Sequence, residues 1–385
     1  MTSAPIETSR FPALDGLRGI AVLGVLVCHI GPQDHDSIWM QPIVWLARLG
    51  WTGVDLFFVL SGFLITGILV ANRTAHNYFR AFYWHRTLRI FPLYFLLLAL
   101  VSILALLAPD VYRSSVLVKG DVWPYWAFLS NLRPFFDIAA ISYLLPTWSL
   151  AVEEQFYVSW SAIAKFVNAR TLAAVAIVVL CMTVSLRCWL MSQPSANPGN
   201  IFYFTFTHLD GLCIGAIIRI IFDSGKHGGA LLFVARNWWL PALILGGILY
   251  FDWLLGPPSL PNSYKPLMMR GGLTAISWLY GALLLHGILI DGWVRWITGV
   301  RLFQSFGKYS FCIYLFQNPV LISLTGVAPW LATSLGTFWH LVVQIAIMYL
   351  VGYLSYRFIE RPLLGLKPLV PYSSRKAILQ QAPAH

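Results

Sequence analysis

Ionisable side chains lie within strongly apolar stretches of this sequence, and their types suit acid–base chemistry and anion binding. The stretch PALDGLRGIAVLGVLVCHI carries Asp15, Arg18 and His29. Eleven helical residues make three full turns plus about 20° and rise about 16 Å, so Arg18 and His29 share one helix face. Asp15 is within ion-pair reach of Arg18. His29 is either a base at the far end of this face or a hydrogen-bonded core residue.

A second stretch, GVDLFFVLSGFLI, places Asp55 at the start of an apolar segment and Ser61 beside Gly62 in its middle. Asp55 either caps a helix or orients the His29 imidazole, because a carboxylate commonly fixes a histidine tautomer. Ser61 and Gly62 allow another helix to approach closely, and packing alone explains this pair.

A pair of arginines, Arg86 and Arg89, lies one helical turn apart at the polar boundary of an apolar segment. Two explanations are open. Arginines anchor membrane helices at the cytoplasmic face. Paired guanidinium groups also match phosphate oxygens bidentately, which predicts a phosphate clamp.

Two adjacent acids, Glu153 and Glu154, lie about seven residues into the apolar segment that follows Pro146. An acid inside a membrane helix costs about 2.5–3.5 kcal/mol, so such residues are functional candidates by default. Neighbouring helical positions point about 100° apart. We therefore expect one acid to face the site and the other to make a structural pair.

The composition indicates whether water or a lipid bilayer surrounds these residues. The chain has 385 residues, of which 58% are hydrophobic and 11% charged, whereas soluble domains carry about 25% charged residues. The sequence therefore predicts an integral membrane protein, and its 17 Trp and 17 Tyr residues suit interfacial aromatic belts. The net charge of +11 comes without a basic run, so nucleic-acid binding is not favoured. The five cysteines are expected to be buried thiols, and no metal site is expected.

We predict an all-α, polytopic membrane helix bundle of about ten transmembrane helices, with both termini cytoplasmic. This orientation puts most of the 26 Lys and Arg residues on the inner side. It requires 122–132 to be non-spanning, inside an outer loop at 109–146. We expect one membrane domain over 1–385, with a core at about 11–362 and short cytoplasmic tails at 1–10 and 363–385. The predicted spans are 14–31, 51–71, 90–108, 147–167, 171–190, 207–223, 239–255, 271–290, 303–325 and 337–357.

These motifs occur together in an order that resembles the acyltransferase-3 family of integral membrane O-acyltransferases. The resemblance rests on "ALDGLRGIAVLGVLVCH", "GVDLFFVLSGFLI", "FYWHRTLRIFPLY" and "WSLAVEEQFY", and closes with "GKYSFCIYLFQNP" and "RFIERPL". It runs from Phe11 to about Pro362. One departure is Gln317, which stands where members often carry a histidine in a "YLxHxP"-like motif. The chain also lacks the SGNH hydrolase-like domain that some members attach.

The resemblance implies transfer of an acyl group, usually acetyl, from cytoplasmic acyl-CoA to a hydroxyl of a glycan. The acceptors implied are lipopolysaccharide O-antigen, exopolysaccharide, peptidoglycan or a lipid-linked sugar, and the location is the bacterial inner membrane. Instead of reaching the acceptor directly, the acyl group could be handed to a separate acyl-carrier or hydrolase-like protein. The residues that the resemblance implies are His29, Glu153 and Glu154 as catalytic candidates and Arg18, Arg86 and Arg89 as donor-binding candidates. We add Asp55 as a catalytic candidate from its position, and Asp15, Ser61, Trp148, Tyr314 and Gln317 in support.

His29 has two candidate roles in such a reaction. It is either the general base on the acceptor hydroxyl or an acyl carrier in a two-step transfer. Glu153, or Glu154 as second choice, would orient His29 or stabilise its protonated form. A proton-coupled transporter or a flippase of lipid-linked sugars is the alternative function, but a cytoplasmic arginine pair opposite a face-matched histidine is not something that a transporter requires.

Overall fold

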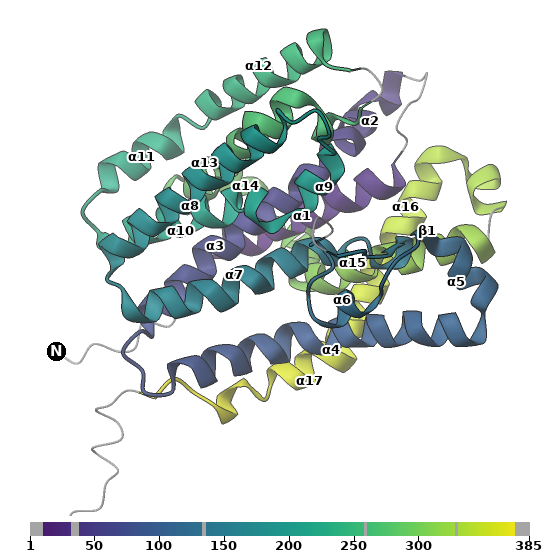
Figure 1. Cartoon of the computed structure of the whole chain (residues 1–385), viewed down its shortest axis with the longest axis horizontal. Helices are drawn as coiled ribbons and strands as arrows, with labels where there is room; N and C mark the ends of the chain where they lie inside the picture. Colours follow the sequence, from purple (N-terminus) through teal and green to yellow (C-terminus); the bar gives the residue numbers. More distant parts are fainter. Residues whose placement is uncertain (1–10, 32–37, 133–135, 258–259, 328–329, 374–385) are drawn as a thin grey trace, which may run out of the picture.

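The computed structural model describes residues 11–31, 38–132, 136–257, 260–327 and 330–373. These residues form a bundle of long helices with a single antiparallel strand pair, β1 (Val116–Val118) with β2 (Ala140–Ile141) (Figure 1). The predicted all-α membrane bundle is confirmed. The predicted tail 1–10, residues 374–385 and part of the outer loop 32–50 lie outside the described residues.

Every one of the predicted spans coincides with a helix of the structure. The long helices are α1 (Pro12–Ile30), α3 (Gly53–Ala71), α4 (Tyr78–Leu107), α7 (Thr147–Phe166), α8 (Ala169–Leu190), α10 (Asp210–Ser224), α12 (Trp239–Leu255), α13 (Leu273–Leu289), α15 (Arg301–Val327) and α16 (Trp330–Ser355). The shorter α-helices are α2 (Gln41–Leu49), α5 (Pro109–Ser115), α6 (Trp123–Trp126), α9 (Pro198–Tyr203), α11 (Gly228–Arg236), α14 (Trp293–Thr298) and α17 (Arg361–Leu364).

Short 3-10 and π turns connect these helices. The 3-10 turns are η1 (Ile38–Met40), η2 (Gly50–Thr52), η3 (Ser142–Leu144), η4 (Thr205–Thr207), η5 (Asn262–Tyr264) and η8 (Lys367–Leu369), and the π turns are η6 (Met268–Gly272) and η7 (Tyr356–Glu360). Single π turns inside helical runs often occur at functional sites, and Glu360 of η7 lies beside Arg89.

By length and composition, the described residues contain six helical segments that can cross a membrane, or seven if the pair α11–α12, bent by 45°, is one span. Three predicted spans fall outside this test: α7, which carries Glu153 and Glu154, α10, which has only 15 residues, and α15. The chain is a multi-pass membrane protein, and the number ten stays a prediction.

Local sequence explains where several helices begin and end. Pro12 at the start of α1 suits a position whose backbone N–H has no helical partner, and Asp15 in the first turn complements the helix dipole. The Asn168 side chain caps α8 by accepting a hydrogen bond from Thr171 N at 3.0 Å. Gly225 ends α10 with a φ of +64°, a conformation that glycine adopts without strain.

Two helix pairs form the centre of the bundle, α1 with α15 and α3 with α10. Glycine makes both contacts close. A Cβ atom added at Gly307 would lie 1.8 Å from Asp15 O, and one at Gly215 would lie 2.1 Å from Val59 O. Small residues let membrane helices pack backbone to backbone, so these glycines fix the helices that carry Arg18 and Ser61.

Both described ends of the chain lie at the same end of the bundle. The Phe11 ring packs edge-on against Phe222 of α10, and Ser373 O accepts a hydrogen bond from His76 N at 3.2 Å in the α3–α4 connection. The segment η7–α17–η8 returns along α4, as the yellow and blue ribbons of Figure 1 show. This arrangement agrees with both termini being on one side of the membrane.

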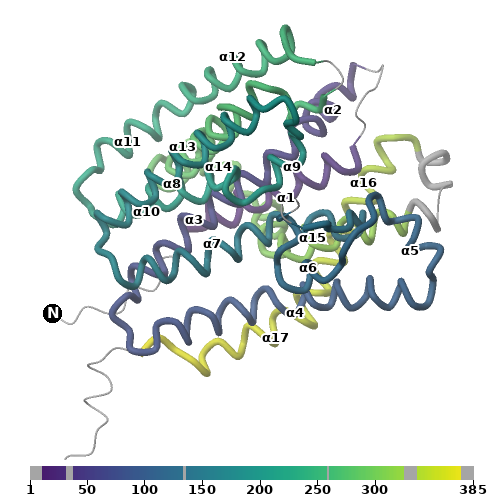
Figure 2. The backbone as a smooth tube through the Cα atoms, in the orientation of Figure 1, coloured from purple at the N-terminus to yellow at the C-terminus, as the bar shows by residue number. Residues whose placement is uncertain are grey.

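The described part of the predicted outer loop 109–146 is folded over the opposite half of the bundle, where Figure 2 shows α5 and α6. Tyr94 Oη of α4 donates to Tyr125 O at 2.6 Å, and Asn318 Nδ2 of α15 donates to Ser142 O at 2.8 Å. The helical part of 122–132 is only the four residues of α6, so this segment is too short to span.

Candidate active site

Charged side chains from three helices, α1, α4 and α7, gather inside the bundle. Arg86 of α4 is an electrostatic neighbour of Arg18 on α1, and Arg89 is a neighbour of both. Glu153 on α7 interacts with Arg86 and Arg89. The structure therefore brings together the donor-binding candidates and the acidic candidates, which come from three separate motifs. Arg18 also makes the predicted ion pair with Asp15, at 3.2 Å.

Glu153 is held by two hydroxyl groups. Ser61 Oγ of α3 donates to Oε1 at 2.7 Å, and Tyr157 Oη, one turn along α7, donates to Oε2 at 2.8 Å. The Arg86 guanidinium lies over the Tyr157 ring, 4.1 Å from its centroid. Ser61 thus does more than pack, because it positions a carboxylate oxygen beside the arginines.

Glu154 has a different environment from its neighbour. Its Oε1 atom is buried without a hydrogen-bond partner in the described structure, and its nearest opposite charge is Arg86. Arg86 Nε is likewise buried and unpartnered. The two acids therefore differ in their contacts, and which of them faces the reacting groups stays a prediction.

Helix α4 starts earlier than the predicted span. It begins at Tyr78 rather than near residue 90, so Arg86 and Arg89 are about 12 and 16 Å along it from its first residue. The apolar count locates only the second part of this helix, because its first three turns are rich in Arg, His and aromatic residues. The two arginines stand where the polar first part of the helix meets its apolar second part, and their position at the membrane boundary stays a prediction.

The returning C-terminal segment adds charges that the sequence analysis missed. Glu360 is buried beside Arg89, and Lys367 lies near both Arg86 and Arg89. His85 bonds Lys367 O at 3.2 Å and thus ties α4 to η8. Burial raises the pKa of Tyr372 to about 12 against the opposing effect of Arg86, so its hydroxyl stays protonated here. The signal available in the sequence was "RFIERPL", where Glu360 follows an apolar run.

His29 lies near the other end of α1, with its ring exposed. Its Nδ1 is 2.8 Å from Val25 O. A carbonyl oxygen only accepts, so Nδ1 carries the proton and Nε2 keeps its lone pair. This tautomer suits a base or a nucleophile. In the described structure neither Asp55 nor Glu153 hydrogen-bonds to the ring.

Asp55 pairs with a different histidine. Its Oδ1 atom lies 3.0 Å from His208 Nε2, and His208 Nδ1 lies 2.8 Å from Phe202 O. Both partners are fully buried. The prediction that Asp55 orients His29 is therefore replaced by an Asp55–His208 pair. The sequence signal for it was His208 at the start of a predicted span.

A second buried pair lies next to it. Arg187 of α8 donates two hydrogen bonds to Asp210, at 2.6 and 3.0 Å, and both side chains are fully buried. Thr274 Oγ1 of α13 donates to the same carboxylate at 2.5 Å. In the sequence Arg187 was assigned to the outer charges, although it lies within a predicted span, where an arginine is a structural or functional candidate.

Ser149 and Tyr314 connect α7 to α15 on the side away from the arginines. Their hydroxyl oxygens are 2.6 Å apart, and Tyr314 is an electrostatic neighbour of Glu153 and Tyr203. Gln317, one turn beyond Tyr314, is fully buried. The supporting candidate Tyr314 therefore lies near Glu153, and Gln317 follows it on the same helix.

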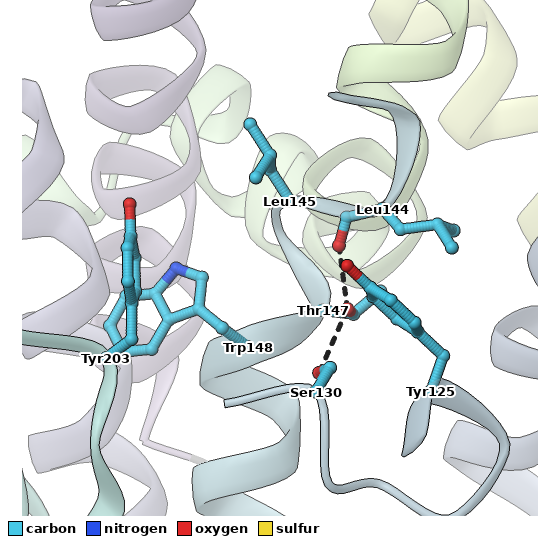
Figure 3. A pocket seen from close by; sticks show the side chains of 7 residues that line it. All are labelled: Tyr125, Ser130, Leu144, Leu145, Thr147, Trp148 and Tyr203. Carbon is cyan, nitrogen blue, oxygen red and sulfur yellow. Dashed lines mark hydrogen bonds between the residues drawn. The ribbon is translucent and has the colours of Figure 1, made fainter. Parts of the chain in front are cut away.

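Trp148 forms one wall of a small pocket shown in Figure 3. Its ring lies 5.1 Å from the Tyr203 ring and 5.4 Å from His208. On the opposite side Thr147 Oγ1 donates to Leu144 O at 2.7 Å and is 3.3 Å from Ser130 Oγ. The pocket is lined by Tyr125, Ser130, Leu144, Leu145, Thr147, Trp148 and Tyr203. Its free volume of about 10 Å³ has room for roughly one water molecule.

Polar residues repeat at every fourth position along α7, at 149, 153, 157, 161 and 165. These five residues, the α7 polar stripe, extend about 24 Å. Each meets another helix or loop: Ser149 meets Tyr314, Glu153 meets Ser61, Tyr157 meets Arg86, Ser161 meets Tyr83 and Lys165 meets Arg73 O. The stripe connects the end of the bundle near the chain termini with the side that holds Trp148.

Fold and site together define a class: a polytopic helical membrane protein with an ionisable site built inside its bundle. No group of three or more His, Cys, Asp or Glu in the described residues is placed to hold a metal ion. The chain belongs to the acyltransferase-3 family, whose model, described as an acyltransferase domain, matches residues 11–357.

Curated relatives cover most of the chain. The "Putative peptidoglycan O-acetyltransferase YrhL" of Bacillus subtilis is 29% identical over 376 residues, which is 91% of this chain and 54% of that protein. The "Peptidoglycan O-acetyltransferase OatA" of Listeria monocytogenes is 27% identical, with 91% and 55% covered. "O-acetyltransferase OatA" of Staphylococcus aureus is 25% identical, with 91% and 57% covered. The chain thus spans little more than half the length of these relatives. No solved structure matches it.

Proposed function

We propose that this chain is a membrane-bound O-acyltransferase that moves an acyl group, acetyl in the first instance, from cytoplasmic acyl-CoA to a glycan hydroxyl. The observation that carries the proposal is the gathering of Arg18, Arg86 and Arg89 beside Glu153 inside the bundle. Family membership supports the reaction class, and the comparisons do not favour the transporter or flippase alternative.

The guanidinium groups of this cluster suit an anionic donor. Arg18 is paired with Asp15, whereas Arg86 and Arg89 interact with Glu153 and with each other and, in the described structure, make no ion pair within 4 Å. Acyl-CoA carries several phosphate groups at its nucleotide end, and guanidinium groups bind phosphate bidentately. The unpartnered Arg86 Nε is a donor available for such an oxygen.

The pantetheine arm of acyl-CoA would follow the α7 polar stripe away from the arginines. Arg18 and His29 are about 16 Å apart along α1, a distance that a pantetheine arm bridges. The thioester then reaches the level of His29 while the phosphates stay on the arginines. Glu153, fixed by Ser61 and Tyr157, orients the arginines and balances their charge.

His29 would act through Nε2. As a general base it removes the proton of the acceptor hydroxyl, and as an acyl carrier it attacks the thioester first. Both roles need the lone pair that the Val25 hydrogen bond leaves on Nε2. We favour the general base, because it completes the transfer in one step.

The acceptor that the relatives' names suggest is peptidoglycan. A sugar ring has an apolar face that stacks on aromatic side chains and hydroxyl groups at its edge. Trp148 and Tyr203 supply aromatic rings, and Ser130 and Thr147 supply hydroxyl groups, on the side away from the arginines. We therefore place the glycan acceptor on that side of the bundle.

The test separates donor binding from chemistry in membranes that contain the purified chain, acetyl-CoA and peptidoglycan-derived oligosaccharides. His29→Gln should lower kcat by about 10²–10⁴-fold and leave CoA binding intact, because only the base is lost. Arg89→Ala should raise KM for acetyl-CoA, since one phosphate contact is worth about 1.5–3 kcal/mol. Rates come from release of the CoA thiol and mass spectrometry of the glycan.

Matched controls exist for both substitutions. Arg80 is exposed on the same helix as Arg89, and His76 is exposed in the preceding turn; Arg80→Ala and His76→Gln should behave like the wild type. Wild-type turnover by His29→Gln would contradict the catalytic assignment. Unchanged CoA binding after Arg86→Ala/Arg89→Ala would contradict the phosphate clamp.

A further inference from the structure

Gln317 on α15 is a buried amide without partners. Its side chain has no exposed surface, and neither Nε2 nor Oε1 makes a hydrogen bond in the described structure. Nearly all buried polar side chains in folded proteins have partners, so such an amide requires an explanation. The next residue shows that partners are in reach of this turn, because Asn318 Nδ2 donates to Ser142 O at 2.8 Å.

The position of Gln317 links the two parts of the proposed site. It lies one turn beyond Tyr314, whose hydroxyl meets Ser149 at the end of the α7 polar stripe. Ile313 and Leu321, one turn to each side of Gln317, pack in one cluster with Leu26. Ile30 packs against the same cluster. Leu26 and Ile30 flank His29 on α1, so Gln317 lies at the depth of His29.

The chemistry of O-acyl transfer fits both unpaired atoms of this amide. The reacting groups present one hydrogen-bond acceptor, the thioester carbonyl oxygen, and one donor, the attacking hydroxyl. A primary amide donates through Nε2 and accepts through Oε1. A donor aimed at the carbonyl oxygen gains strength as negative charge develops there, which is how oxyanion-stabilising groups act.

We propose that Gln317 is a catalytic residue that binds the reacting acyl group, with Nε2 donating to the thioester carbonyl oxygen and Oε1 accepting from the acceptor hydroxyl. The inference rests on the proposed acyl transfer and names a residue for it. The ligand class is a short acyl thioester, and the depth of Gln317 places its carbonyl at the level of His29.

The acyl transfer adds the hydroxyl to the carbonyl carbon and then expels the thiol. The hydroxyl oxygen attacks the carbonyl carbon and its proton passes to His29 Nε2, while Gln317 Nε2 donates to the resulting oxyanion. The carbon–oxygen double bond re-forms and the carbon–sulfur bond breaks. The sulfur leaves with the electron pair and takes the proton from His29, which gives free CoA thiol and an O-acyl glycan.

Gln317→Met is the sharpest variant, because methionine keeps the length and volume of the side chain and removes both polar atoms. We expect kcat to fall about 10²–10³-fold, as for loss of an oxyanion donor. CoA binding and thermal stability should be unchanged, since exchanging an unpaired buried polar group for an apolar one of the same shape is neutral or favourable for folding.

Gln344→Met is the matched control. Gln344 is also a buried glutamine with an unpartnered Oε1, but it lies on α16. The same substitution there should leave kcat within about threefold of the wild type. If both variants lose activity equally, the effect belongs to buried glutamines in general and the proposal fails.

Binding of a non-reacting analogue tests the carbonyl contact without any acceptor. A ketone analogue of acetyl-CoA, with a methylene group between sulfur and carbonyl, should bind the wild type about threefold to tenfold tighter than CoA. Gln317→Met should bind both equally. Gln317→Glu, which exchanges the Nε2 donor for an oxygen, should also lose the preference.

The outcomes separate this inference from the proposed function. A wild-type chain that transfers no acetyl group from acetyl-CoA overturns the proposed function. An active wild type with an equally active Gln317→Met or Gln317→Glu overturns only the role of Gln317. A Gln317→Met variant that loses activity together with CoA binding or thermal stability shows a packing role and overturns it as well.

Discussion

At the scale of single residues, the Asp55–His208 pair shows how burial decides the role of an acid. His208 Nδ1 must carry a proton, because Phe202 O can only accept. A single proton is then shared between His208 Nε2 and Asp55 Oδ1, whichever atom holds it. The Trp148, Phe58 and Phe202 rings surround the imidazole and exclude water. The pair holds α3 against the segment that precedes α10.

Removing one partner of this pair should be costly. Asp55→Leu leaves His208 Nε2 buried and unpaired, so we expect a loss of about 3–5 kcal/mol in the free energy of unfolding. Asp55→Asn keeps a hydrogen-bonding group of the same shape and should lose much less. Thermal unfolding in detergent micelles measures both.

Asp291, exposed in an ion pair with Arg295, is the control, because Asp291→Leu should change stability by less than about 1 kcal/mol. Equal stability of Asp55→Leu and Asp291→Leu would contradict a structural role for the pair.

At the scale of elements, the glycine contact between α1 and α15 determines how far Arg18 and His29 lie from the rest of the site. Gly307 faces Asp15 O, and Gly19 faces Phe303 O. The helices therefore meet at their backbones and leave no room for a methyl group. Because α15 also carries Tyr314 and Gln317, any shift of this contact moves both halves of the proposed site relative to each other.

A methyl group at Gly307 should disturb stability and activity together. Gly307→Ala must push α15 away from α1, at a cost of about 1–3 kcal/mol in the free energy of unfolding, and kcat should fall because His29 and Gln317 separate. Gly246→Ala on α12 is the same chemical change where no atom lies within 4 Å of the added Cβ, so stability should be unchanged or slightly higher. Thermal unfolding and acetyl transfer are measured on both. A Gly307→Ala variant as stable and active as Gly246→Ala would show that the contact is not close in the membrane.

At the scale of the whole molecule, hydrophobic runs predict the helices well and the cross-helix partners poorly. The ten predicted spans are all helical, because apolar length is what a bilayer selects. The start of α4 was missed because its first turns are rich in polar residues, although they bond to α7 and the C-terminal segment. The motifs put Arg18, Arg86, Arg89 and Glu153 on the candidate site. No local pattern shows that Asp55 meets His208, 153 positions away, because that contact depends on how α3 and α10 pack.

Whether α10 crosses the membrane determines on which side of the bilayer each later segment lies. In the ten-span arrangement, the connection after α8 lies outside and the connection after α10 lies inside. Ser195 and Lys226 are exposed in these two connections. In an active variant whose five cysteines are replaced by serine, Ser195→Cys should react with a membrane-impermeant maleimide on intact spheroplasts. Lys226→Cys should react only after permeabilisation, because an α10 that spans separates the two sites by the bilayer. Labelling of both from one side would show that α10, with its 15 residues, does not cross, and would put every later connection on the side that the charge bias did not predict.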